Sequence, residues 1–262
     1  MTRKCFFLPN LSDGEECVSL PRETVHHLES VLRSRPGDSI ELRDGEGHAW
    51  EGVIEEIKGG AIRVRLLERR ILHNESPLKV TLAVAIARSD RMELVIRQAT
   101  ELGVNRIMVF RAARSQYGLR GAQAEKKHER WLKIAREALC QCGRARIPEI
   151  MVLSEIEELL AYVPGWEKEE GLRIKVVALE SKAEKNLLAL THSVPVCKQV
   201  MTVIGPEGGW SDQEVERFRK ADFDFVHLGP RILRFETAAV AIVSAVQLLW
   251  GDFGGSIGEQ LK

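Results

Sequence analysis

The sequence lacks any long apolar run. No stretch approaches the roughly 20 residues that a membrane-spanning helix requires, and the opening residues, MTRKCFFLPNLSDGEE, contain no apolar signal-peptide core. The chain has 262 residues, of which 44% are hydrophobic and 29% charged, and this balance is typical of a globular protein with one or two domains. We therefore expect a cytoplasmic protein that does not enter the membrane.

Cysteine is scarce and has no metal-binding spacing. The five cysteines are odd in number and scattered through the chain, so a disulfide framework is not expected. Neither CxxC nor HExxH occurs, and Cys140 and Cys142 would point in different directions on a helix. The sequence therefore predicts a reducing compartment, no metal site, and cysteines that serve as small buried or half-buried residues.

The common nucleotide-binding loops are also missing, because neither GxxxxGK[ST] nor GxGxxG occurs. A different glycine-rich turn, IGPEGGWSDQE, spans residues 204–214 between an apolar strand and a helix that Ser211 and Glu214 should open as a capping box. Its glycines permit close backbone approach, but Glu207 would repel a phosphate. The turn favours a ligand with hydroxyls, an amine or a positive centre, and a purely structural tight turn is the alternative.

Net charge is zero, but the charges are unevenly distributed. Between Arg106 and Arg146 the sequence holds eleven Lys or Arg residues and three acids, whereas acids gather in residues 155–170. Such a segment can attract a polyanion although the whole chain is neutral. Binding of nucleic acid along this segment is one interpretation, and a solvated helix with surface arginines is the other.

Two regions with different periodicity divide the chain near residue 74. Residues 1–73 hold short alternating strands with Asp44-Gly45 and Gly59-Gly60 as hairpin turns, which predicts a small antiparallel barrel of about four to six strands. Residues 74–262 alternate buried strands with amphipathic helices, which predicts a mostly parallel sheet with helices on both faces. Strands are expected at 80–86, 106–110, 174–180, 199–205 and 224–229, and helices at 90–103, 125–142 and 234–250.

A second motif, LGPRILRFETAA, spans residues 228–239 and leads into the last helix. That helix, residues 234–250, is apolar on almost every side, so it should be buried in the core or against a partner subunit. Charged residues at its start, among them Arg234 and Glu236, are costly unless they are paired or functional. A second binding loop is one interpretation, and a structural Arg–Glu pair that caps the helix is the other.

The two motifs together resemble the C-terminal signature of the RsmE family, the bacterial 16S rRNA uridine N3-methyltransferases of the SPOUT superfamily. SDRMELVIRQATELGV and REALCQCGRARIPEI resemble further segments of that family, and HHLESVLRSRPGD resembles the start of its N-terminal domain. The resemblance implies a PUA-like β-barrel, an RNA-binding domain, in residues 1–73. It also implies a SPOUT methyltransferase domain in residues 74–262, an α/β fold with a mostly parallel sheet and a C-terminal trefoil knot. Knots are too rare to be predicted from periodicity, so the knot depends on the resemblance alone.

The resemblance also implies a function. The protein would transfer a methyl group from S-adenosyl-L-methionine to N3 of a specific uridine, acting as a homodimer on 16S rRNA or the small ribosomal subunit. Arg234 and Glu236 are the candidate catalytic residues, because an arginine can stabilise charge on the uracil oxygens and a carboxylate can orient the base or accept its proton. The arginines expected to bind RNA are Arg33, Arg88, Arg91, Arg114 and Arg144.

The resemblance further implies that backbone amides and apolar side chains hold the methyl donor, and these suit a flat base better than charge does. The residues expected to do so are Leu179, Glu180, Gly205, Pro206, Glu207, Gly208, Gly209, Leu228, Gly229, Ile232, Leu233, Thr237 and Ala238. Two alternatives stay open. One is a SPOUT methyltransferase that acts on a ribose 2'-OH or a tRNA base, and the other is a non-catalytic RNA-binding protein, against which the presence of both glycine-proline loops counts.

Overall fold

The chain folds into two compact units. The computed structural model describes residues 4–12, 14–26, 28, 32–118, 121–168, 171–180, 183 and 185–254. The first unit contains residues 1–75 and 136–147, and the second contains residues 76–135 and 148–262. The first unit is therefore discontinuous in sequence, because the last turns of helix α3 (Gly121–Cys142) and the segment that follows them belong with the N-terminal strands.

The first unit is built on a five-stranded sheet with strand order β1-β3-β4-β5-β2. Its strands are β1 (Cys5–Phe7), β2 (Cys17–Ser19), β3 (Ser39–Arg43), β4 (His48–Lys58) and β5 (Ala61–Ile71), and a short helix, α1 (Arg22–His26), follows β2. Gly59 and Gly60, with φ of 60° and 73°, form the predicted hairpin turn between β4 and β5. β1 pairs with β3 in parallel, so the sheet is not wholly antiparallel as expected. Its apolar side chains, among them Leu42, Ile54 and Ile62, form one buried cluster.

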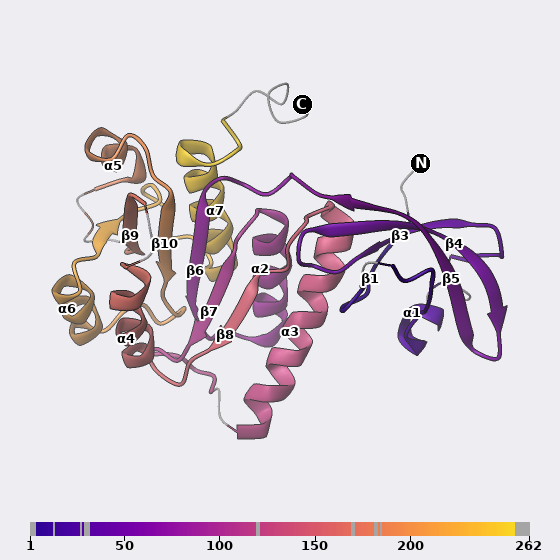
Figure 1. Cartoon of the computed structure of the whole chain (residues 1–262). Helices are drawn as coiled ribbons and strands as arrows, with labels where there is room; N and C mark the ends of the chain where they lie inside the picture. Colours follow the sequence, from indigo (N-terminus) through magenta and orange to yellow (C-terminus); the bar gives the residue numbers. More distant parts are fainter. Residues whose placement is uncertain are drawn as a thin grey trace. The chain divides into compact units, whose positions relative to one another are not determined.

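The second unit is built on a six-stranded sheet with strand order β11-β9-β10-β6-β7-β8 (Figure 1). The strands are β6 (Lys79–Ala85), β7 (Arg106–Phe110), β8 (Glu149–Val152), β9 (Arg173–Ala178), β10 (Gln199–Ile204) and β11 (Asp224–Val226). All pairings between these strands are parallel, so the prediction of a mostly parallel sheet is confirmed. Every residue of β10 is buried, which explains why its sequence is almost continuously apolar.

Helices cover both faces of this sheet. They are α2 (Ser89–Glu101), α4 (Ile156–Trp166), α5 (Leu187–Ser193), α6 (Asp212–Lys220) and α7 (Phe235–Trp250), together with the part of α3 that belongs to this unit. α7 packs against β6, β10 and α2, whereas α4 and α6 lie on the opposite face (Figure 1). Side chains alternate along each strand, so one strand supplies apolar contacts to both layers.

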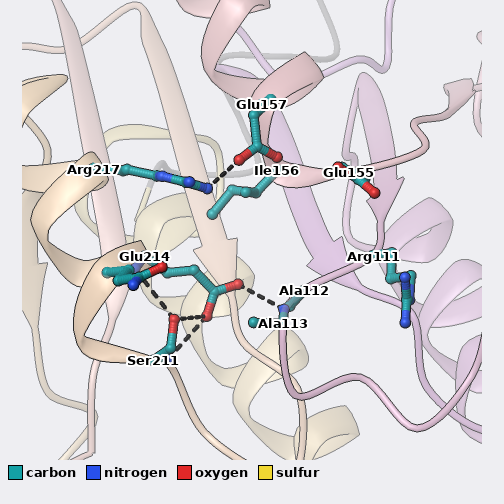
Figure 2. Close-up of a pocket in the computed structure, with 10 residues that line it drawn as sticks. Arg111, Ala112, Ala113, Glu155, Ile156, Glu157, Ser211, Glu214 and Arg217 are labelled. Carbon is teal, nitrogen blue, oxygen red and sulfur yellow. Dashed lines mark hydrogen bonds and ion pairs between the residues drawn. The ribbon is translucent and has the colours of Figure 1, made fainter.

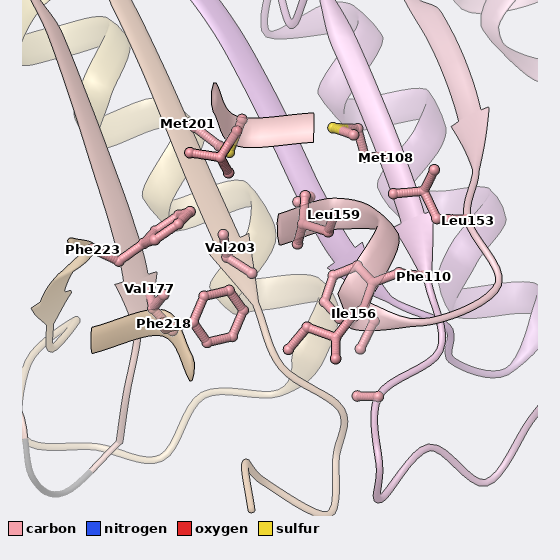
Figure 3. Close-up of a cluster of buried hydrophobic side chains, with 14 of the residues drawn as sticks. Met108, Phe110, Leu153, Ile156, Leu159, Val177, Met201, Val203, Phe218 and Phe223 are labelled. Carbon is pink, nitrogen blue, oxygen red and sulfur yellow. The ribbon is translucent and has the colours of Figure 1, made fainter. Parts of the chain in front are cut away.

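The apolar cluster beneath α4 and α6 reaches the carboxyl ends of the strands (Figure 3). Val203 of β10 meets Leu159 of α4 and Phe218 of α6 in this cluster, which also contains Phe110 at the end of β7. Phe218 is fully buried, and its ring packs edge-on against Phe223 with centroids 5.1 Å apart. Close packing of these rings fixes the positions from which the loops leave the sheet.

Helix α7 is buried on one face only. The buried residues include Phe235, Ala239, Ile242 and Val243, while most of the opposite face is half-buried and Leu248 is 58% exposed. Burial within the core on all sides, one of the two expectations for this helix, is therefore wrong. The other expectation, an apolar face against a partner subunit, stays a prediction.

Candidate functional site

Three loops leave the same edge of the parallel sheet. β11, β9 and β10 are neighbours, and their registers pair Val226 with Ala178 and Val177 with Val203. The segments after these strands therefore begin side by side, and the amide of Leu179 donates to the carbonyl oxygen of Val226 at 2.9 Å. β11 ends at Val226, so the remainder of the strand expected at 224–229 is loop instead. The carboxyl edge of an open parallel sheet is where ligands usually bind.

Each glycine of the glycine-rich turn is explained by the protein itself. A Cβ on Gly205 would lie 2.7 Å from the ring of Trp210, and one on Gly208 would lie 3.2 Å from the carbonyl oxygen of Arg114. Gly209 has a φ of 69°, which side chains disfavour. These glycines fit the turn to its neighbours. The interpretation that they are there for close approach of a ligand is therefore not needed to explain them.

Trp210 joins the glycine-rich turn to strand β9. Its indole N–H donates to the carbonyl oxygen of Ala178, the last residue of β9, at 3.0 Å. The ring stacks on Phe110 with centroids 6.2 Å apart and meets Phe218 edge-on at 5.1 Å. Trp210 is not among the predicted site residues, although a tryptophan directly after two glycines is a signal that packing anchors the turn.

Glu214 ties the glycine-rich turn to the loop after β7. With Ser211 it forms the predicted capping box at the start of α6, and the Ser211 amide and hydroxyl donate to Oε2 at 2.9 and 2.8 Å. Its Oε1 accepts the amide of Ala113 at 2.9 Å, and the residue is only 2% exposed. The next residue, Arg114, donates from Nη1 to the carbonyl oxygen of Gly208 at 3.2 Å. Two contacts therefore hold these loops together.

Arg91 in the first turn of α2 contacts both sequence motifs. Its Nη1 donates to Oε1 of Glu207 at 2.6 Å, and its Nε lies 3.9 Å from Oε2 of Glu236. That Glu236 oxygen is buried and has no hydrogen-bond partner among the described residues. Arg234 is the N-cap residue of α7 and is exposed, and its side chain makes no capping bond. The expected alternative, an Arg–Glu pair that caps α7, is not formed by these two residues in the described structure.

The residues predicted to hold a methyl donor lie on these loops or in the first turn of α7. Of these residues, Leu179, Leu228, Leu233 and Ala238 are half-buried, Pro206 is buried, and Glu180, Ile232 and Thr237 are exposed. The side chain of Glu207 is 28% exposed, and Gly205, Gly208, Gly209 and Gly229 complete the set. Ile232 is 79% exposed, although it is a large apolar residue. Backbone amides and partly uncovered apolar side chains together fit a ligand with a flat aromatic base.

The arginines predicted to bind RNA have different surroundings. Arg33 in the first unit and Arg88 and Arg114 in the second are exposed. Arg144 is 5% exposed, and its Nη2 donates to Oε2 of Glu75 at 2.6 Å. Because this guanidinium is buried and bound within the first unit, the structure corrects the expectation that Arg144 contacts RNA.

A cavity of about 200 Å³ lies next to the capping box (Figure 2). It is lined by the loop after β7, the start of α4 and the first turns of α6, including Arg111, Glu155 and Glu214. Arg217 and Glu157, also in its wall, form an ion pair. None of the lining residues is among those predicted to hold the methyl donor, so the cavity is distinct from the three loops.

The described residues show neither a membrane-spanning helix nor a metal cluster. In that part of the chain, every helix is too short or too polar to cross a bilayer. Within the same residues, no three His, Cys, Asp or Glu side chains are arranged to hold a metal ion. The cysteines are free thiols, and a hydrogen bond with Cys5 together with burial raises the pKa of the Cys140 thiol. A thiol in that state is a poor nucleophile.

Two family models match the chain. A model of an RNA methyltransferase domain matches residues 74–247, and a model of an RNA methyltransferase PUA domain matches residues 20–67. Ribosomal RNA small subunit methyltransferase E of Bacillus subtilis is 34% identical over a match of 242 residues, and the match covers 89% of this chain and 92% of the relative. The protein of the same name from Mycobacterium tuberculosis is 30% identical over 259 residues, which are 99% and 97% of the two chains.

Solved structures give the same result. A Legionella pneumophila protein in complex with bound SAM is 30% identical with a TM-score of 0.87, and the match covers 97% of this chain and 100% of that one. Ribosomal RNA small subunit methyltransferase E from Neisseria gonorrhoeae, solved with S-adenosyl methionine, is 34% identical with a TM-score of 0.82. That match covers 96% of this chain and 99% of the other.

Proposed function

The chain belongs to the RsmE family of ribosomal RNA methyltransferases, and from this premise we propose that it methylates N3 of a specific uridine in 16S rRNA, with S-adenosyl-L-methionine as the donor. The resemblance that the two motifs suggest is confirmed by the family models and by relatives that span most of the chain. The observation that carries the proposed function is the meeting of three loops at the carboxyl edge of β11, β9 and β10.

We propose that the donor is held by residues of the three loops and of the first turn of α7: Leu179, Glu180, residues 205–209, Leu228, Gly229, Ile232, Leu233, Thr237 and Ala238. When bound, S-adenosyl-L-methionine supplies a methyl group already activated by its sulfonium. The chain contributes backbone amides from the glycine-rich turn and apolar surface from Leu228 and Ile232. Trp210 supports this assignment, because its bond to Ala178 keeps two of the three loops in register.

We assign the chemistry at the uracil ring to Arg234 and Glu236. N3 of uracil must lose its proton before it can attack, and the negative charge then spreads onto the two neighbouring carbonyl oxygens. Arg234 is exposed at the start of α7, so its guanidinium can stabilise that charge. Glu236 has a buried oxygen without a hydrogen-bond partner in the described structure, which suits it to accept the proton or orient the base.

The RNA is proposed to contact exposed arginines in each unit. Arg33, Arg88 and Arg114 are the candidates that keep an exposed guanidinium. Contacts of this kind go mainly to phosphates, so they position the RNA while the target base turns out of its stack into the site. Binding through phosphates also predicts an affinity that falls steeply with salt.

A homodimer in the cytoplasm is the proposed working form. The outer face of α7 supports this proposal, because it is apolar and includes the exposed Leu248. Replacement of Leu248 by Asp should shift the protein toward monomer in sedimentation experiments, whereas the same replacement at exposed Leu67 of the first unit should not. The trefoil knot implied by the family stays a prediction.

Methyl transfer to ribosomal RNA is the experiment that tests the proposed function. Labelled donor is incubated with the protein and with undermethylated small subunits or 16S rRNA, and the RNA is digested to nucleosides. We expect label in N3-methyluridine. Label in a 2'-O-methyl nucleoside, or transfer to added tRNA in a parallel reaction but not to the 16S rRNA, would refute the target assignment, and RNA binding without transfer would favour a non-catalytic protein.

A further inference from the structure

One side chain connects the two motifs that make up the candidate donor site. Arg91 is on α2, Glu207 is in the glycine-rich turn, and Glu236 is in the first turn of α7. The guanidinium donates to Glu207 from Nη1 at 2.6 Å and presents Nε toward Glu236 at 3.9 Å. Helix α2, which carries Arg91, also packs along α7. Arg91 therefore belongs to a helix that already contacts the second motif.

The three charged groups are partly shielded from water. The side chains of Arg91, Glu207 and Glu236 are 32%, 28% and 16% exposed. Coulomb interactions at such sites are stronger than between fully exposed groups, because less solvent screens them. Without the guanidinium, two carboxylates from different loops would repel each other across the same space, and the buried oxygen of Glu236 would lose its ion pair.

A neighbouring arginine shows how specific this arrangement is. Arg88 directly precedes α2, but its Nε and Nη2 donate to Asp90 at 2.6 and 2.5 Å. This pair therefore joins two residues that are only two positions apart in the chain. Both side chains of that pair are more than half exposed. Arg88 therefore presents its charge to solvent without joining distant parts of the chain, while Arg91 joins two loops.

We propose that Arg91 is a positioning residue of the donor site, not an RNA contact as the sequence suggested. It holds the glycine-rich turn against the start of α7 and keeps the Glu236 carboxylate in place. This inference rests on the proposed function, because it assumes that the donor lies between those loops. A guanidinium suits the role because it offers several donors in a fixed plane, whereas a lysine ammonium is a single point charge.

The test compares Arg91→Gln with Arg88→Gln, two losses of one positive charge close together in sequence. Calorimetry measures the dissociation constant for S-adenosyl-L-methionine, and filter binding at two salt concentrations measures that for 16S rRNA. We expect Arg91→Gln to weaken donor binding by about three- to tenfold, as loss of a partly shielded ion pair implies. Arg88→Gln should leave donor binding within about twofold and reduce the salt dependence of RNA binding instead.

Further variants separate positioning from general loss of structure. Arg91→Lys should recover part of the donor affinity, and Arg91→Gln should raise the KM for the donor more than it lowers kcat. Glu207→Gln breaks the same contact from the other side, so the double variant Arg91→Gln/Glu207→Gln should be little worse than either single variant. The single variant Glu207→Gln also keeps the test available if Arg91→Gln does not fold.

Two results would overturn the inference. One is equal loss of RNA affinity in Arg91→Gln and Arg88→Gln with unchanged donor affinity, and the other is additive loss of donor affinity in the double variant. Failure of the proposed function looks different, because the unmodified protein would then bind no donor at all. Thermal unfolding of each variant accompanies the binding data, so that loss of folding is recognised directly.

Discussion

Two groups of arginines in this molecule have the same charge and opposite surroundings. In the first unit, Arg43 and Arg144 are buried. Nη2 of Arg43 lies 2.6 Å from Oε1 of Glu41, and its Nη1 donates to the Arg144 carbonyl oxygen at 2.7 Å. In the second unit, Arg88 and Arg114 are exposed at the start of a helix or in a loop. The first group is saturated by partners within the protein, whereas the second keeps donors that face solvent.

The number of charged residues in a segment is therefore not the charge that the segment offers on the surface. Arg114 and Arg144 belong to the same basic segment, yet only Arg114 remains exposed. A buried ion pair affects stability mainly when one of its partners is removed, because the other is then left as an uncompensated charge in a medium of low dielectric. An exposed arginine contributes little to stability and is free to contribute to binding.

The largest expected effect is on the first unit. Arg144→Ala removes the guanidinium from the half-buried Glu75 carboxylate, which keeps only the Ala145 and Arg146 amides as donors, so we expect a loss of about 1.5–3 kcal/mol. Thermal and urea unfolding should show that loss, whereas Arg146→Ala, an exposed neighbour, should change stability by less than about 0.5 kcal/mol. Equal stabilities of the two variants would show that the contact between Arg144 and Glu75 does not stabilise the first unit.

A glycine substitution tests the second unit. Gly208→Val puts a side chain within 3.1 Å of the Arg114 Cβ, so the loop after β7 has to move away from the glycine-rich turn. We expect the chain to stay folded and donor binding to fall below detection in calorimetry. Gly165→Ala is the matched control, because nothing lies within 4 Å of its Cβ position. Donor binding that survives Gly208→Val would show that the glycine-rich turn is not part of the donor site.

Glu214 links loops of the second unit as Glu75 links segments of the first. Glu214→Gln replaces one acceptor oxygen with an amide, so either the Ala113 amide or the Ser211 cap is lost. The free energy of unfolding should fall by about 1–2 kcal/mol, and amide exchange at Ala113 should accelerate. Ser211→Ala should weaken the cap but leave exchange at Ala113 nearly unchanged, and equal acceleration in both would contradict separate roles.

The smallest expected effect is the titration of an exposed pair. The hydrogen bond from Arg88 lowers the pKa of Asp90 from 3.8 to about 2. A carboxyl with a lower pKa in the folded state stabilises the protein above pH 3.8, and this contribution is lost as the pH falls through about 2. Arg88→Gln should return the pKa of Asp90 toward 3.8, and NMR titration of the carboxyl group would measure this change. A value still near 2 would mean that another group holds it.

The sequence predicted local features well. The strand at 106–110 and the Ser211–Glu214 capping box agree with the structure because each depends on residues close together in the chain. The parallel pairing of β1 with β3, the partners of Arg91 and the burial of Arg144 involve residues far apart, and no periodicity encodes them. The motifs indicated the edge of the sheet that carries the candidate site, but they did not indicate which side chains hold its loops together.

A crystal structure with S-adenosyl-L-methionine bound would show directly whether the donor lies among the three loops. We expect density for the donor, with its base against the apolar side chains of the three loops, among Leu179, Glu180, residues 205–209, Leu228, Gly229, Ile232, Leu233, Thr237 and Ala238. Density in the cavity lined by Arg111, Glu155 and Arg217 would contradict this expectation, because those residues would then form the donor site.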